Sequence, residues 1–198
     1  IAIFVGVNLV YKELERKTIY TIIPKPVHRY QFVLGKFFGM VLTLTVQLVI
    51  MAAVLCAVIA LQGATPSLAL GKMITLIFLE VTVVTAVAVL FSSFSSPFLS
   101  GLFTIGVFLL GRSVPDIRQV AKKAQNPILT PLLGFIGHAV PNLRYFYATG
   151  ADAGTKHVSL HAAFPDWSYV GVAGLYALIY VTLTLLLAIA LFSRRDFI

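Results

Sequence analysis

One acidic residue lies inside a long apolar stretch and is the first candidate for chemistry. Glu80 stands between the runs ITLIFL and VTVVTAVAVL, about two helical turns after Lys72. An unpaired carboxylate is unfavourable inside a membrane, so such residues usually face a bundle interior, a cavity or a partner. Two interpretations follow for Glu80. It lies in a substrate path or gate, or it is a structural carboxyl that is protonated or paired, with Lys72 in reach.

Two histidines have the spacing of metal ligands on one helical face. His157 and His161 stand in KHVSLHAAFPD, with Asp152 and Asp166 nearby. Imidazole pairs bind zinc or copper, but a site needs further ligands. Because this segment has weak helical signals, loop histidines without a metal are the simpler interpretation, and we predict no metal in this chain.

Sequence motifs for hydrolytic chemistry are absent. The chain contains no G-x-x-x-x-G-K-[ST], no H-E-x-x-H and no G-x-S-x-G. Four serines at positions 92, 93, 95 and 96 have no neighbouring His or Asp. We therefore expect a chain that is not an enzyme and that binds no cofactor of its own.

The elements that must position these residues are membrane-spanning helices. The chain has 198 residues, of which 59% are hydrophobic and 11% charged, whereas soluble domains carry about 25% charged residues. Residues 37–71, 81–111 and 167–193 contain no Asp, Glu, Lys or Arg. Each stretch exceeds the roughly 20 residues that a helix needs to cross the hydrocarbon. The sequence predicts an all-α polytopic membrane protein.

The net charge of +8 is concentrated outside the apolar stretches. Basic residues gather in 12–36, in 112–166 and at Arg194 and Arg195. Such clusters at membrane edges set orientation and contact lipid headgroups, so lipid and not nucleic acid is the expected partner. The positive-inside rule places residues 12–36 in the cytoplasm. Residues 112–166 then lie outside as a long loop.

We expect four full spans, and their predicted limits are residues 31–61, 72–94, 98–111 and 167–192. Gly and Pro predict a turn at 62–71, and the serines and Pro97 predict a tight reversal at 94–97. Without that reversal, the long loop would lie inside and the Arg-Arg tail outside. Residues 127–140 are apolar but too short to cross, which predicts an interfacial or re-entrant helix. Residues 1–10 are interpreted as the end of a span whose beginning is missing.

Residues 11–29, YKELERKTIYTIIPKPVHR, have an apolar helical face opposite a charged one. Pro24 and Pro26 end this helix, because proline lacks an N–H and restricts the preceding residue. Two interpretations stay open on these residues alone. The helix rests on lipid headgroups, or it docks a cytoplasmic partner.

The chain resembles the membrane (permease) subunits of type-2 ABC exporters. An E-x-E-x-x-T stretch followed by P-x-x-R matches at Glu13, Glu15, Thr18, Pro26 and Arg29. Further matches are the hairpin LFSSFSSPFLSGLFTIGVFLLG at 90–111, VPNL at 140–143 and FSRRDF at 192–197. Together these matches cover nearly the whole chain in the family's order.

The resemblance implies a six-span permease fold, of which four full spans and the end of another are present in one transmembrane domain over 1–198. It implies a cytoplasmic coupling segment at 11–29 and short external helices within 112–166 that form an outer gate. It also implies a nucleotide-binding ATPase subunit that holds ATP and Mg, a second permease copy, and a bacterial or archaeal plasma membrane. The residues implied to couple to the ATPase are Glu13, Glu15, Arg16, Lys17, Thr18, Lys25, Pro26 and Arg29.

Two other functions compete with this one. The chain could be a membrane scaffold or assembly factor that anchors a cytoplasmic partner and transports nothing. It could also be an ion-driven secondary transporter that uses Glu80, but such folds usually carry an internal repeat of spans, and the sequence shows none.

Overall fold

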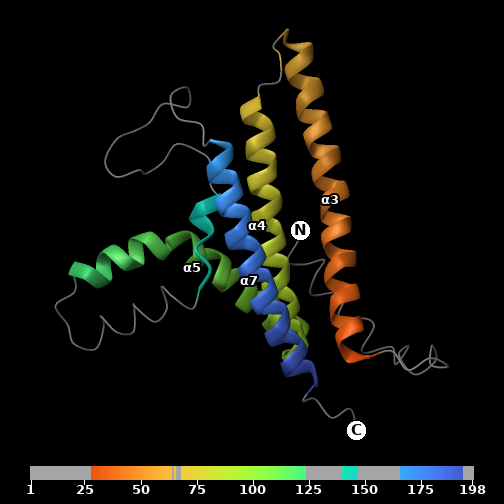
Figure 1. Ribbon diagram of the computed structural model, residues 1–198, viewed down its shortest axis with the longest axis vertical. Coiled ribbons are helices and arrows are strands. Elements are labelled where there is room, and N and C mark those ends of the chain that lie inside the picture. Colours follow the sequence, from red (N-terminus) through yellow and green to blue (C-terminus); the bar gives the residue numbers. More distant parts are fainter. Residues whose placement is uncertain (1–27, 64, 66–67, 124–139, 147–165, 194–198) are drawn as a thin grey trace.

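A computed structural model describes residues 28–63, 65, 68–123, 140–146 and 166–193. Within these ranges the chain is helical and contains no strand. The elements in order are α3 (Arg29–Leu61), α4 (Leu68–Phe94), α5 (Pro97–Lys123), the 3₁₀ helix η1 (Leu143–Phe146) and α7 (Trp167–Ser193) (Figure 1).

Four of these helices are long and apolar enough to cross a membrane. They are α3 from Tyr30, α4, α5 as far as Val120, and α7. At about 1.5 Å per residue, the 27 residues of α4 or of α7 extend about 40 Å, which exceeds the roughly 30 Å of hydrocarbon. The prediction of an all-α polytopic membrane protein is confirmed.

The helix ends follow local chemistry. At the start of α3, the Gln31 side-chain oxygen accepts the N–H of His28 at 3.1 Å. At its end, Gly63 has φ of 74°, a left-handed conformation that glycine adopts without strain. The predicted turn at 62–71 is too long, because α4 already begins at Leu68.

The predicted reversal between α4 and α5 is confirmed. α4 ends at Phe94 and α5 begins at Pro97, where proline suits the first helical position because that N–H has no intrahelical partner. The alternative of one unbroken segment over 72–111 is therefore wrong.

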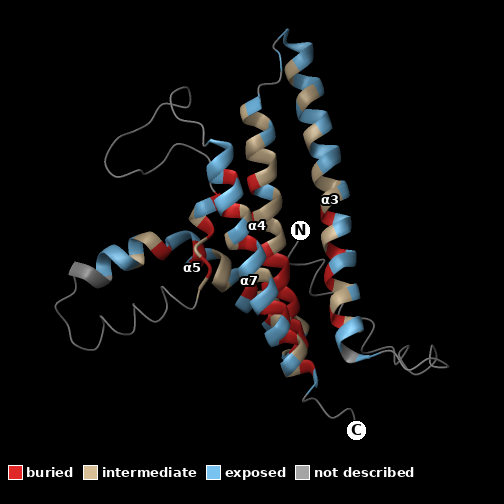
Figure 2. Cartoon of the chain, viewed as in Figure 1, coloured by how far each residue is buried: buried red, intermediate tan, exposed pale blue. Residues whose placement is uncertain are grey.

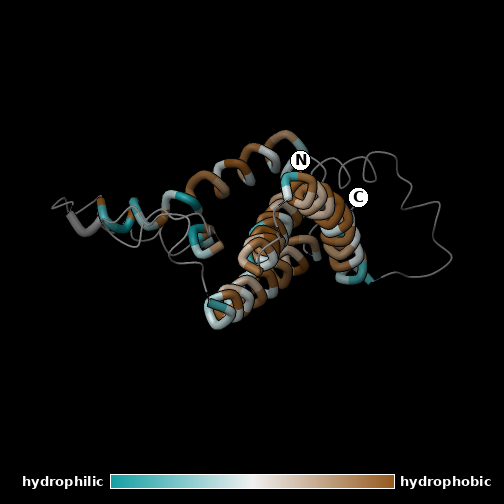
Figure 3. The backbone as a smooth tube through the Cα atoms, turned by 90° about the horizontal axis from the view of Figure 1, so that it is seen from above, coloured by the Kyte–Doolittle hydropathy of each residue, from teal (hydrophilic) through white to brown (hydrophobic). Residues whose placement is uncertain are grey.

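The predicted end of α5 at Gly111 is wrong. The helix continues through Pro115 to Lys123, so the segment predicted as a loop from Arg112 begins as helix. The first charged residue marks the end of the apolar stretch but not the end of the helix, and Val114 is fully buried beyond it. Figure 3 shows α5 changing from a hydrophobic first half to a hydrophilic end that extends away from the other helices.

α4 lies at the centre of the bundle and contacts α3, α5, η1 and α7. Small residues line its contact with α7, including Ala86 on α4 and Ala173 and Ala188 on α7, and small residues allow membrane helices to approach closely. Figure 2 shows the buried residues concentrated along α4 and α7, whereas much of α3 is exposed. The exposed side chains of α3 are large and apolar, as expected for a lipid-facing surface; they include Leu42, Val46 and Ile50.

Candidate functional site

The candidate site is an ion pair that joins α4 to α5. Arg112 Nη2 lies 2.9 Å from Glu80 Oε1. The Glu80 side chain is 10% exposed and that of Arg112 is 42% exposed. The Arg112 guanidinium also lies 5.0 Å from the centre of the Phe108 ring, a cation–π distance. The buried carboxylate is thus paired with a cation that itself reaches a more open region.

The helical hairpin explains why these two residues meet. Glu80 precedes the reversal at Ser95 and Ser96 by about four helical turns, and Arg112 follows it by about four. Two antiparallel helices joined by so short a turn place residues at equal distance from it opposite one another. Glu80 also lies near the middle of α4, so the ion pair is well inside the length of that helix.

One interpretation of the sequence placed Lys72 in reach of Glu80, but the carboxylate pairs with Arg112 instead. The Lys72 ammonium lies instead 5.5 Å from the centre of the Trp167 ring on α7. Sequence reasoning considered neighbours on the same helix and missed a partner 32 positions away. The tight reversal could have identified Arg112 as the partner. Arg112 is the first charged residue after the reversal, and it lies about as many residues beyond the reversal as Glu80 lies before it.

A second set of polar contacts holds η1 against α5 and α7. Arg144 Nη1 lies 3.3 Å from Asp116 Oδ1 on α5. The backbone N–H of Asn142 donates to the hydroxyl of Tyr176 at 2.9 Å. The Tyr169 hydroxyl donates to the carbonyl of Tyr145 at 2.8 Å. The segment around η1 is therefore held against both α5 and α7.

The contact between α5 and this segment is too close for any side chain on Gly111. A Cβ there would lie 2.7 Å from the carbonyl oxygen of Pro141 and 2.9 Å from Leu143 Cγ. Both distances are shorter than van der Waals contact. Glycine is thus required at the place where α5 meets η1.

We expect Gly111→Ala to lower the free energy of unfolding by about 1 to 3 kcal/mol, the usual cost of overpacking. The matched control is Gly106→Ala on the same helix, where a new Cβ meets nothing within 4 Å and alanine favours the helix. Denaturant unfolding of the purified protein in detergent measures both variants. Equal stability of the two variants would contradict the required close approach.

Tyr176→Phe should also destabilise the η1 segment. The variant removes the acceptor of the half-buried Asn142 N–H, and loss of such a hydrogen bond costs about 0.5 to 1.5 kcal/mol. Tyr30→Phe is the control, because Tyr30 is 47% exposed at the start of α3. The same unfolding assay compares them, and a loss no greater than that of the control would show that this hydrogen bond does not hold η1.

The buried hydroxyls near the reversal form no catalytic arrangement. Ser92 and Ser93 donate to carbonyls of their own helix at 2.9 and 2.6 Å, and Thr104 does so at 2.7 Å. In the described ranges, the Ser100 hydroxyl is the buried side-chain group without a hydrogen-bond partner. Among the same residues, no three His, Cys, Asp or Glu side chains gather into a metal site.

Most of the residues predicted to couple to an ATPase lie outside the described residues: Glu13, Glu15, Arg16, Lys17, Thr18, Lys25 and Pro26. Arg29 begins α3, but its side chain is not among those described. His157 and His161 also lie outside the described ranges, as does nearly all of the apolar segment 127–140. These predictions therefore stay predictions.

Four helices that are long and apolar enough to cross a membrane, two of them joined by the Glu80–Arg112 ion pair, define a polytopic helical membrane protein. The family described as "ABC-2 family transporter protein" matches residues 1–197, and the chain belongs to this family. It is thus the membrane permease type of ABC transporter component, as the resemblance of its motifs indicated. No curated protein and no solved structure matches the chain.

Proposed function

We propose that the chain is the permease subunit of an ATP-driven exporter in a bacterial or archaeal plasma membrane. The observation that carries this proposal is the family match over residues 1–197. In this proposal a separate nucleotide-binding subunit supplies ATP and Mg, as the resemblance to type-2 ABC exporters implies. Two permease copies form the translocation path between them.

The coupling segment at 11–29 transmits the ATPase movement to the membrane. The sequence pattern of residues 11–29 predicts an amphipathic helix that ends at Pro24 and Pro26, and in this proposal that helix acts as a short lever ahead of α3. The residues that contact the ATPase in this proposal are Glu13, Glu15, Arg16, Lys17, Thr18, Lys25, Pro26 and Arg29.

The ion pair of Glu80 and Arg112 connects the central helix to the outer gate. Arg112 lies on α5 next to Gly111, which packs against the η1 segment. A movement of α4 is therefore passed to α5 and η1 through a charged contact and a close backbone contact. This geometry supports a gating role for Glu80 without a direct contact to substrate.

Co-purification tests the proposal most directly. Tagged full-length protein, solubilised from its own host in mild detergent, is expected to bring down a nucleotide-binding subunit that hydrolyses ATP. The reconstituted complex should then move a substrate only with hydrolysable nucleotide. If no such subunit is retained, or if the complex moves nothing while the chain still anchors another cytoplasmic protein, the scaffold function replaces the exporter.

A further inference from the structure

The η1 segment is attached to α7 through its own backbone. The Tyr176 hydroxyl accepts the N–H of Asn142, the residue directly before η1, at 2.9 Å. The Tyr169 hydroxyl donates to the carbonyl of Tyr145, in the last part of η1, at 2.8 Å. Tyr169 and Tyr176 are two helical turns apart, so they lie on the same face of α7. Two hydroxyls on one helix face therefore hold both ends of η1.

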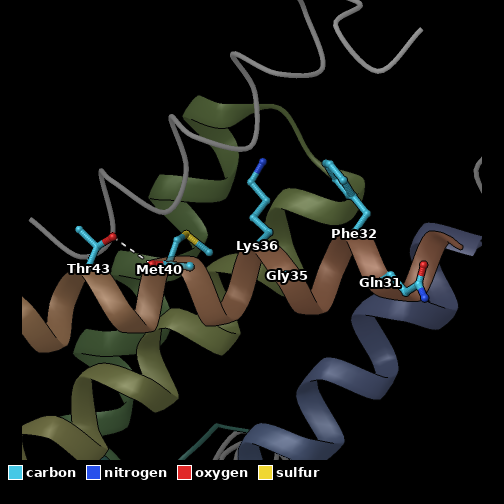
Figure 4. A pocket seen from close by; sticks show the side chains of 7 residues that line it. Gln31, Phe32, Gly35, Lys36, Met40 and Thr43 are labelled. Atoms are coloured by element: carbon cyan, nitrogen blue, oxygen red, sulfur yellow. Dashed lines mark hydrogen bonds between the residues drawn. The ribbon is translucent and has the colours of Figure 1, made fainter. Parts of the chain in front are cut away.

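These bonds differ from the hydroxyl bonds of other described helices. Thr43 and Thr82 donate to a carbonyl one turn earlier in their own helix, at 2.9 and 2.8 Å, and Figure 4 shows this bond for Thr43 on α3. Such a bond satisfies the hydroxyl locally and holds no second element. A bond from a tyrosine of α7 to the backbone of the η1 segment exists only while the two segments stay together.

The contact of η1 with α5 is of another kind. A Cβ on Gly111 would lie 2.7 Å from the Pro141 oxygen and 2.9 Å from Leu143 Cγ, so this contact is closely packed. On the α7 side, Tyr145 and Tyr169 are both exposed, and water can replace the hydrogen bond that joins them. The η1 segment should therefore separate from α7 more readily than from α5.

We propose that Tyr169 and Tyr176 form a hydroxyl clamp that sets how often η1 separates from α7. The inference rests on the proposed place of η1 in the outer gate. Burial of Phe146 and its ring contact with Tyr176, at 6.1 Å between centres, favour the closed arrangement. The two hydroxyl bonds add to that preference, and a change of tyrosine to phenylalanine removes each bond while it keeps the ring.

Ala173 provides a reporter of this separation. It lies between Tyr169 and Tyr176, one turn from each and on the same face of α7. It is 3% exposed and belongs to the buried cluster that α7 shares with η1. The test uses purified full-length protein in mild detergent, with Cys56→Ser to remove the native thiol of this chain and Ala173→Cys to introduce the reporter. A charged maleimide then labels the introduced thiol when η1 has separated.

Tyr176→Phe is expected to raise the labelling rate about fivefold, because the half-buried N–H of Asn142 loses its acceptor. Tyr169→Phe should raise it only about twofold, since its hydrogen bond is exposed and water competes for it. The two bonds hold opposite ends of η1, so the double variant should label about tenfold faster. Tyr30→Phe, at the exposed start of α3, should leave the rate unchanged.

Ala188→Cys is the matched control reporter. It replaces another alanine of α7, which is 0% exposed and lies in the other buried cluster, and its labelling should stay slow in every variant. The clamp is overturned if the double tyrosine variant labels Ala173→Cys no faster than Tyr30→Phe does. It is also overturned if labelling of Ala188→Cys rises equally, because the whole bundle would then have loosened.

The labelling assay needs neither ATP nor a transported substrate, so it separates the clamp from the exporter function. Faster labelling of the tyrosine variants supports the clamp even if co-purification brings down no ATPase subunit and the exporter proposal fails. Unchanged labelling overturns the clamp even if the ATPase subunit is retained.

Discussion

An Arg112→Leu variant is expected to unfold with a free energy about 3 to 5 kcal/mol lower than the unaltered protein. The substitution keeps much of the side-chain volume but removes the cation that lies 2.9 Å from Glu80. Glu80 is only 8% exposed, so its carboxylate would stay buried without compensation. Denaturant unfolding in detergent measures the loss.

The double variant Glu80→Leu with Arg112→Leu separates charge from packing. It removes the stranded carboxylate and should regain most of the lost stability, because apolar replacement of a buried pair is often neutral. Lys72→Leu is the matched single control, since Lys72 pairs with the face of Trp167 and not with Glu80; it should cost about 1 kcal/mol or less. A double variant as unstable as Arg112→Leu would show that the ion pair is not the cause.

Reversing two charges in the coupling segment should have the largest effect on function. Arg16→Glu with Lys17→Glu places two carboxylates on the charged face of the segment at 11–29. If this face docks the ATPase, repulsion replaces attraction and like charges in an interface cost several kcal/mol. We expect the double variant to lose ATP-dependent transport and to retain less than a tenth of the ATPase subunit, measured by transport assay and pull-down.

The matched control reverses Arg194 and Arg195, which form the other basic pair predicted to lie in the cytoplasm. That variant should insert normally and keep both transport and the ATPase subunit. Membrane fractionation checks insertion of each variant. Unchanged transport after reversal of Arg16 and Lys17 would count against the coupling role, and equal loss in the control would point to a general effect of membrane-proximal charge.

Sequence reasoning succeeded where one local property decides the structure. Stretches without charge must be helical in lipid, and they predicted α3, α4 and α7 to within a few residues. The serines and Pro97 likewise located the reversal, because proline cannot continue a helix from inside it without losing a hydrogen bond.

Sequence reasoning failed where contacts between distant segments determine the structure. α5 continues beyond Gly111 to a fully buried Val114, and no local sequence pattern indicates that burial. The Arg112 partner of Glu80 and the hydrogen bond from Asn142 to Tyr176 join positions more than 30 residues apart. Such contacts follow from how the helices pack against one another. A single amino-acid sequence does not show that packing.

The shortness of the apolar part of α5 has a consequence for the surrounding bilayer. Residues 97–111 extend only about 22 Å, whereas the hydrocarbon is about 30 Å thick, and the half-exposed Arg112 guanidinium follows directly. On the opposite flank, the 33 residues of α3 extend about 50 Å. The uninterrupted apolar surface that the protein presents to lipid is therefore shorter along α5 than along α3, although α5 as a whole is long enough to cross the membrane.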